Sequence, residues 1–352
     1  MIMNRTLPTA LALLLAASGM AQFPRIVLQG TGDPAVYTDL DDAITAAQPG
    51  DKLYLSGGTF TVAGPFPVDK PLHFIGAGIH PDSTNVTGTT TIATTGNSAA
   101  HLIITTAASG SSFTGIIFNP SSSGAGVVYG TSTADDDPTG VVFQRCEFKR
   151  YLDLGFAEGA TSSSTFDECI FRGDVQGRAG RAVITRSIFD GATINLFRPS
   201  GLFLKNSVVL NAQLANSSNA IVQNCVFTYN GAPLWQVSSV QISNCLVRGA
   251  SMFSNSNTSS ETNNIFGVAA ASIFVNETND SYQYSDDPHL SPTSGGVGMG
   301  NDGNDIGLYG THSPLKPGNV PYNPHYRQAE IAPSTDWNGA LPVQVRTAAQ
   351  TH

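Results

Sequence analysis

The chain repeats one short pattern of apolar and polar positions seven times between Val141 and Gly267. Each copy has a large apolar residue first, two polar residues, a small fourth residue, a variable fifth residue and a large apolar sixth residue. The fourth positions are Cys146, Cys169, Ser187, Ser207, Cys225, Cys245 and Asn264. Their spacing runs from 18 residues (Cys169 to Ser187) to 23 residues (Cys146 to Cys169). Self-similarity at a period near 20 residues indicates a repeat architecture.

The alternation inside the pattern predicts strands rather than helices. The fourth and sixth positions face one way and the fifth faces the other, as in a strand with period two. The copies are rich in β-forming residues, and no helical pattern of roughly 10–15 residues separates them. A step of about 20 residues fits one coil of a solenoid made of three short strands, with coils stacked at about 4.8 Å. The fourth positions should then form one inward-facing column.

The third position of the pattern becomes asparagine in the later copies, at Asn206, Asn224, Asn244 and Asn263. Asparagine tolerates turn geometry, and its amide can pass hydrogen bonds from coil to coil. In these residues the chain resembles the right-handed parallel β-helix proteins of the pectate-lyase-like superfamily, with their asparagine ladder. The resemblance covers most of the chain and implies an all-β fold, a right-handed parallel β-helix (solenoid). It says little about activity.

The first 21 residues have the features of a signal peptide. Arg5 is followed by an apolar run from Leu7 to Met20 and by the small residue Ala21. The run is too short to span a bilayer, so cleavage before Gln22 is expected. No later segment is apolar enough to span one. We therefore expect export, with the mature protein secreted, periplasmic or at the cell surface.

A short helix is predicted just before the first coils. Thr38 and Asp41 resemble a capping box, and Leu40, Ala43, Ile44 and Ala47 form one apolar face. Such a helix would cover the open end of the first coil. The stretch Asp39–Val62 also resembles the N-terminal entry of the same superfamily. We assign residues 22–280 to a parallel β-helix with an N-terminal capping helix.

Residues 281–352 form an irregular, proline-rich C-terminal segment that would pack on the helix or lie beyond it. Its stretch Asn301–Gly310 resembles the closing motif of secreted bacterial β-helix proteins, most closely those of the Bacteroidetes type.

The fifth position of the pattern is aliphatic in six of the seven copies, which predicts an apolar stripe on the outside of the solenoid. The stripe includes Ile170, Ile188, Val208, Val226 and Leu246. Exposed stripes of this size are rarely left in water. Either the tail from Tyr282 to Val345 covers it, or it supports self-association with another subunit. A third alternative is that the inner and outer faces are reversed.

The chain carries a net charge of −9, and only 12% of its residues are charged. An acidic balance disfavours nucleic acid and anionic membrane surfaces as partners. The low charge accompanies 41% hydrophobic residues, so it indicates a folded β protein rather than disorder.

Two outward ranks of charged residues are candidate substrate-binding groups. The first rank holds Lys149, Arg172, Asp190 and Arg248, and the second holds Asp167 and Lys205. They could form a groove for an acidic polysaccharide, or a solvated face of paired charges. The galacturonan-cleaving and pectinesterase signatures of the superfamily are absent from the sequence. We therefore favour a non-catalytic protein that binds a glycan or forms part of the cell envelope or surface. The alternative is a polysaccharide lyase or glycoside hydrolase acting on an acidic polysaccharide.

No cofactor is indicated, apart from a weak possibility of calcium. Asp302 and Asp305 lie in an oxygen-rich loop of the kind that binds Ca²⁺, although a structural turn is the favoured interpretation. None of the seven histidines has the spacing of a metal site. The four cysteines share one repeat position, so they are either disulfides between adjacent coils or inert buried thiols.

Overall fold

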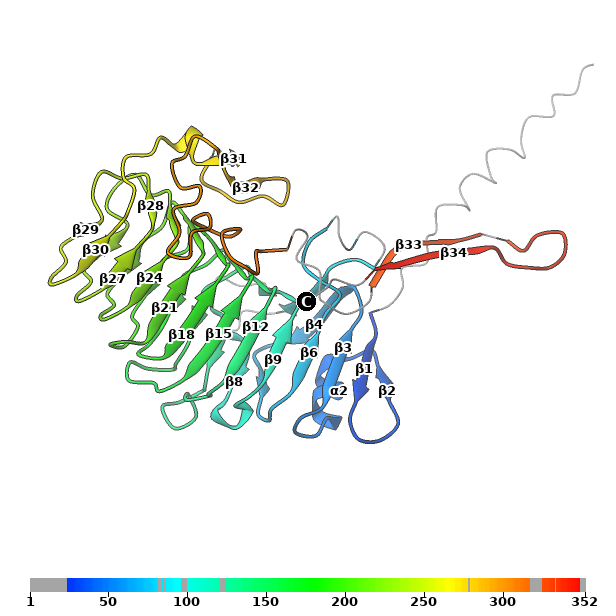
Figure 1. Cartoon of the computed structure of the whole chain (residues 1–352). Helices are drawn as coiled ribbons and strands as arrows, with labels where there is room; N and C mark the ends of the chain where they lie inside the picture. The colour runs from blue at the N-terminus through cyan, green and yellow to red at the C-terminus, as the bar shows by residue number, and fades with distance from the viewer. Residues whose placement is uncertain are drawn as a thin grey trace, which may run out of the picture.

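The computed structural model describes residues 24–348 except 82–83, 85–86, 96–99, 121–124, 278, 317–324 and 333. Within them the chain forms a parallel β-solenoid of about nine turns with one α-helix near its N-terminal end (Figure 1). This confirms the predicted all-β solenoid. The predicted signal peptide lies outside the described residues. Within the described part, no helix has the length and apolar character needed to cross a membrane.

Three parallel sheets form the walls of the solenoid, and each turn contributes one strand to each sheet. Sheet A has the spatial order β2 (Ala35–Tyr37), β1 (Ile26–Gln29), β3 (Lys52–Leu55), β6 (His73–Ile75), β9 (Ser112–Thr114), β12 (Val141–Gln144), β15 (Ser163–Asp167), β18 (Arg181–Thr185), β21 (Leu202–Lys205), β24 (Ile221–Gln223), β27 (Gln241–Ser243) and β30 (Ser260–Thr262). Only the contacts of β1 with β2 and β3 are antiparallel in this sheet.

Sheet B consists of β4 (Gly58–Ala63), β7 (Thr90–Thr95), β10 (Ile117–Pro120), β13 (Glu147–Phe148), β16 (Ile170–Phe171), β19 (Ile188–Asp190), β22 (Val208–Leu210), β25 (Val226–Phe227) and β28 (Leu246–Val247). Sheet C consists of β5 (Phe66–Val68), β8 (Ala100–Ile104), β11 (Ala125–Tyr129), β14 (Leu152–Asp153), β17 (Val175–Gln176), β20 (Ile194–Asn195), β23 (Leu214–Ala215), β26 (Leu234–Trp235) and β29 (Phe253–Ser254). The remaining elements are α2 (Leu40–Ala46), η2 (Thr106–Ala108), η3 (Ala270–Ser272), the hairpin β31 (Phe274–Asn276) and β32 (Asp287–Leu290), and the hairpin β33 (His325–Ile331) and β34 (Val343–Ala348).

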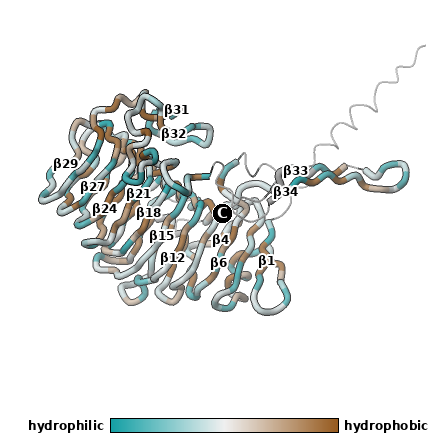
Figure 2. The backbone as a smooth tube through the Cα atoms, in the orientation of Figure 1, coloured by the Kyte–Doolittle hydropathy of each residue, from teal (hydrophilic) through white to brown (hydrophobic). Residues whose placement is uncertain are grey.

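Like residues stack on like residues along the core, as the repeat predicts. The Phe143 ring stacks on Phe113 and Phe166, with centroids 4.9 and 5.1 Å apart. The fourth-position column is also confirmed, because the Cys169 N–H donates to Ser187 Oγ at 3.1 Å in the next coil. Figure 2 shows hydrophobic positions recurring from coil to coil. Stacked, buried side chains of this kind are the main stabilising contribution in a solenoid.

The four cysteines are free thiols buried in this column. Burial raises the pKa of the Cys146 thiol to about 12 and raises that of Cys169 well above its ordinary value. A thiol with so high a pKa carries almost no thiolate at neutral pH and is a poor nucleophile. The cysteines therefore serve as small apolar side chains in the core.

Helix α2 covers the first coil, as predicted. Leu40, Ala43 and Ile44 are buried against the core. The N-cap is Asp39 rather than Thr38, because the Asp39 side chain accepts a hydrogen bond from the Asp42 N–H at 3.1 Å. At the C-terminal end of α2, the carbonyls of Ile44 and Ala47 accept hydrogen bonds from Lys70 Nζ, which fixes this end of the helix to the solenoid.

The third repeat position is a left-handed turn between sheets A and B, with φ of +50° at Asn206, +54° at Asn224 and +53° at Asn244. This confirms the preference for asparagine there. The expected coil-to-coil role of these three amides is wrong, however. Their Nδ2 groups donate to Gly310 O (3.0 Å), Asn301 Oδ1 (2.8 Å) and Met299 O (2.9 Å), respectively. The asparagines fasten a distant C-terminal segment to the solenoid.

Residues 268–316, called the covering segment from here on, lie over the outer face of sheet B (Figure 1). The aliphatic stripe is buried beneath them: Ile170, Ile188, Val208, Val226 and Leu246 are at most 3% exposed. Apolar side chains of the covering segment, including Ile273, Phe274, Ile306 and Leu308, complete this second core. The covering hypothesis is confirmed for this segment, and the inner and outer faces are as predicted.

Two expectations about this region are corrected. Self-association through the stripe is wrong as stated, because those five side chains are already packed against the same chain. The last part of the tail does not lie on sheet B either. Hairpin β33–β34 projects away from the solenoid, and its Ile331, Val343 and Val345 are exposed (Figure 1).

Candidate functional site

The first charged rank lies at the corner where sheet B leads into sheet C. Phe148, Phe171 and Phe189 are paired in register in three adjacent coils. Lys149, Arg172 and Asp190 directly follow them in the chain, so these three residues also lie in adjacent coils. Arg248 belongs to the same rank but lies three coils beyond Asp190. The intervening positions, Leu210 and Thr228, are each 1% exposed. The rank is therefore not one continuous groove, and its cationic part is the Lys149–Arg172 corner.

This corner contains a shallow groove of about 280 Å³. The residues that line it are Lys149, Arg150, Tyr151, Arg172, Gly173, Asp174 and Gln176. Of the six side chains among these residues, three are cationic and one is anionic, and Tyr151 is half-buried. The adjacent carboxylates of Glu147 and Asp190 pair with two of these cations, so the groove offers a polar ligand cationic hydrogen-bond donors, an aromatic wall and a side-chain amide.

Gly173 makes the floor of the groove possible. A Cβ atom at this position would lie 2.4 Å from both the carbonyl carbon of Arg150 and the backbone nitrogen of Tyr151. Such a contact is sterically forbidden, so only glycine lets the two coils approach so closely at this corner. The close approach brings Arg150 and Tyr151 next to the Arg172 coil.

A buried carboxylate holds the two cations of the rank. Glu147 Oε1 accepts hydrogen bonds from Lys149 Nζ and Arg172 Nε, both at 2.5 Å, and Glu147 is fully buried. Arg172 also pairs with Asp190 and donates to the Tyr282 carbonyl at 3.0 Å. Burial by itself would lower the pKa of Arg172, but the hydrogen bond to Glu147 and the attraction to Glu147 and Asp190 raise it. Arg172 is thus fixed in its cationic form.

The outer face of sheet C continues from the groove along the solenoid axis. One outward row, in register over five coils, consists of Asp153, Gln176, Asn195, Ala215 and Trp235. At a coil spacing of about 4.8 Å, the row extends over ~19 Å from Asp153 to Trp235. Amide side chains along it can hydrogen-bond hydroxyl groups, and the partly exposed Trp235 offers an aromatic face at its far end.

The second charged rank serves a different purpose. Asp167 and Lys205 flank Thr185 in the register of sheet A, as predicted. Asp167 accepts hydrogen bonds from Arg186 Nε at 3.0 Å and from Thr185 Oγ1 at 2.6 Å, and Arg186 Nη1 donates to Ser313 of the covering segment. Asp167 thus helps to anchor that segment and does not line the groove.

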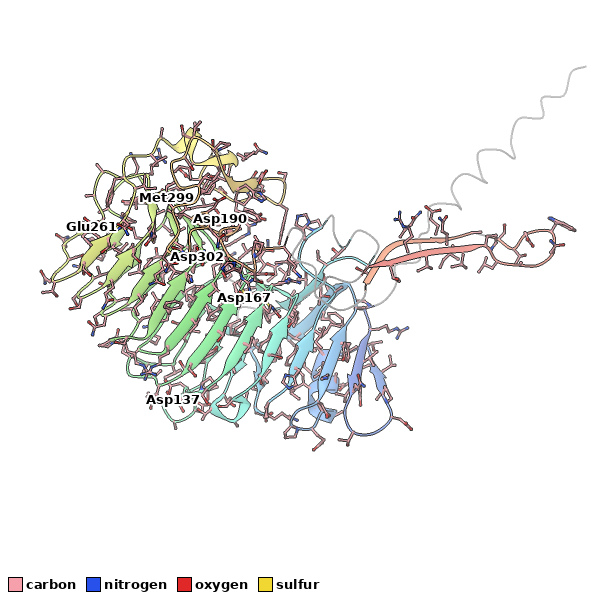
Figure 3. All side chains as sticks on the ribbon, in the orientation of Figure 1. Asp137, Asp167, Asp190, Glu261, Met299 and Asp302 are labelled. Carbon is pink, nitrogen blue, oxygen red and sulfur yellow. The ribbon has the colours of Figure 1, made fainter. Side chains whose placement is uncertain are left out.

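Arg248 has an equivalent anchoring role. Its Nη1 atom lies 2.7 Å from Asp280 Oδ2 in the covering segment. Arg248, Asp190 and Arg186 together fix this segment along its length. In Figure 3, Asp167, Asp190 and Asp302 all lie on the side that the covering segment crosses.

The calcium candidates close turns. Asp305 Oδ1 accepts the Gly298 N–H at 2.8 Å, and Asp302 Oδ1 accepts the Asn304 N–H at 3.2 Å. Among the described residues, no three His, Cys, Asp or Glu side chains gather in a way that could hold a metal ion. The two carboxylates therefore have structural partners of their own.

A larger hollow of about 430 Å³ lies beside α2 and includes Asp41, Asp69 and Lys70 in its wall. Lys70 is its one cation, and Lys70 Nζ donates to the carbonyls of Ile44 and Ala47 at the end of α2. This hollow is part of the cap, and the sheet B–sheet C corner is the better candidate site.

Several groove and face residues were not predicted from the sequence, among them Arg150, Tyr151, Gln176 and Trp235. The run Lys149-Arg150-Tyr151, directly after a repeat copy, was a usable signal for the first two. No such signal exists for the others, because most strands of sheet C in the regular coils are two residues long and carry no repeated phrase.

No protein-family model matches this chain, and a search of curated proteins finds no similar sequence. The class of protein is therefore defined by the structure itself. It is a parallel β-solenoid with a corner groove lined by cationic side chains, and the groove continues onto a polar outer face of sheet C that ends at Trp235.

Proposed function

We propose that this protein is an exported, non-catalytic β-helix protein that binds an acidic polysaccharide. The glycan chain would cross the corner groove and run along the outer face of sheet C. The observation that carries the proposal is the groove, in which Lys149, Arg150 and Tyr151 are brought against Arg172 by the close approach at Gly173.

The chemistry of the surface suits such a ligand. Lysine and arginine form charge-assisted hydrogen bonds with carboxylate or sulfate groups. Tyr151 and Trp235 offer aromatic faces to the apolar sides of sugar rings, and Gln176 offers an amide to their hydroxyl groups. The ~19 Å row is long enough for several sugar residues of an extended chain.

The arrangement supports binding rather than catalysis. A general base must be able to give up or take a proton near neutral pH. Arg172 is held in its cationic form by Glu147 and Asp190, which raise its pKa, and both carboxylates are engaged in these ion pairs. The absence of superfamily catalytic signatures and the signal-peptide-like leader support a binding protein that is secreted, periplasmic or on the cell surface.

Calorimetric titration of the mature protein with polygalacturonate, alginate and neutral dextran tests the proposal. We expect micromolar binding of the two acidic polymers that weakens as salt is raised, and no binding of dextran. The same samples should show no rise in the ultraviolet absorbance of unsaturated sugar products. Absence of binding to every acidic polymer would contradict the proposal, and product formation would instead favour the lyase alternative.

A further inference from the structure

Glu147 is an exception in the aliphatic stripe. The paired positions in the adjacent coils are Ile117 on one side and Ile170 on the other, and the stripe continues with Ile188 and Val208. Glu147 is as fully buried as its aliphatic neighbours. Burying a carboxylate is costly and an aliphatic residue would pack at this place, so stability alone does not explain the charge.

The contacts of Glu147 connect the groove to the covering segment. Its Oε1 atom accepts from Lys149 and Arg172, which both line the groove. Its Oε2 atom accepts the hydroxyl of Tyr284, a residue of the covering segment, at 2.9 Å. One carboxylate therefore joins two groove cations to a segment that is more than a hundred residues away in sequence.

Tyr282 adds a second connection to the same corner. Its carbonyl accepts from Arg172 Nη1 at 3.0 Å, and its N–H donates to Asp190 Oδ1 at 3.1 Å. The Arg172 guanidinium carbon also lies 5.9 Å from the centre of the Tyr282 ring. The orientation of Arg172 is thus set jointly by the solenoid and by the covering segment.

We propose that Glu147 and Tyr284 are positioning residues for the acidic-glycan site, and that glycan binding is coupled to docking of the covering segment. The inference rests on the proposed function, since it concerns the same groove. Tyr284 holds Glu147, Glu147 holds Lys149 and Arg172 at fixed positions, and the glycan meets cations that are already ordered. Pre-ordering of long side chains reduces the entropy lost on binding.

Tyr284→Phe is the first test, because it removes one hydroxyl and leaves charge and ring unchanged. Polygalacturonate should bind about 3- to 10-fold more weakly, as expected for losing part of a positioning contact. Tyr309→Phe is the matched control. It makes the same change in the covering segment at a ring that stacks on His289, and it should leave affinity within about twofold of wild type. Equal affinity of Tyr284→Phe and wild type would overturn the proposal.

Glu147→Leu is the second test, because the change in charge and the loss of positioning would alter glycan affinity in opposite directions. The change restores the aliphatic residue of the stripe but removes the ion-pair partner of Lys149 and Arg172, so circular dichroism is recorded first to verify that the fold is retained. It also adds one net positive charge near the groove, which by itself would tighten binding of a polyanion. Weaker binding by Glu147→Leu, with an unchanged circular dichroism spectrum, therefore points to lost positioning, and tighter binding would contradict the proposal.

Hydrogen exchange provides a readout that a purely structural role would not change. Because coupling is reciprocal, polygalacturonate should slow amide exchange in residues 279–286 of the wild type, and less so in Tyr284→Phe. Unchanged exchange there, together with measurable binding, would overturn the coupling alone. If the wild type bound no acidic glycan, the proposed function would fail, and this inference with it.

Discussion

Replacing Lys149 and Arg150 together by glutamine is expected to weaken polygalacturonate binding by at least about 100-fold, because each lost charge-assisted hydrogen bond contributes about 1.5–3 kcal/mol. Both side chains line the groove, and Arg150 is exposed. Arg172 keeps its ion pairs with Glu147 and Asp190 in this variant, so the corner should stay folded. Calorimetry at low salt measures the effect.

Lys205→Gln is the control for this experiment. Lys205 lies on the outer face of sheet A, away from the groove, and its replacement removes a charge of the same kind. Affinity should stay within about twofold of wild type if attraction is local, because distant surface charges are screened by salt. A similar loss in Lys205→Gln and in the double variant would mean that the groove has no special role.

Glu168→Ala is expected to lower the free energy of unfolding by about 3–5 kcal/mol, because it removes one member of a fully buried ion pair. Arg145 Nε and Glu168 Oε2 are 2.5 Å apart, and both side chains are fully buried. Arg186 Nη1 is a second cation, 3.6 Å from Glu168 Oε1. Chemical denaturation followed by circular dichroism measures the loss.

The double variant Arg145→Met, Glu168→Leu shows how much of the loss in unfolding free energy comes from the ion pair itself and how much from removing only one of its two partners. Replacing both partners by apolar residues leaves no buried unpaired charge at these two positions. We expect it to be more stable than Glu168→Ala. An equal or larger loss in the double variant would show that the pair itself is a strong net contributor to stability.

The repeated phrase was sufficient to predict the solenoid, because a coil places the same residue type at the same point in every turn. Cys146, Cys169 and Ser187 could be assigned to one column for this reason. The stripe that includes Ile170 and Val226 was predicted on the same basis, and so was the need to cover it. The short cap helix followed from its apolar face.

The long-range contacts could not be predicted in the same way. Asn224 was expected to bond within the solenoid, but its amide bonds Asn301, 77 residues away. Glu147 was the one fifth position without an aliphatic residue, and its role depends on Tyr284, which belongs to no repeat. The face of sheet C was missed because a strand of two residues, such as Ile194–Asn195, has too few positions to show a period.

Hydroxyl-radical footprinting of the wild-type protein, with and without saturating polygalacturonate, shows which face of the solenoid the glycan covers. We expect protection of Tyr151 and Trp235, which mark the two ends of the glycan path over sheet C. Phe203, on the outer face of sheet A, should react equally with and without the glycan. Protection of Phe203 with no change at Tyr151 and Trp235 would contradict the assignment of the glycan to the corner groove and sheet C.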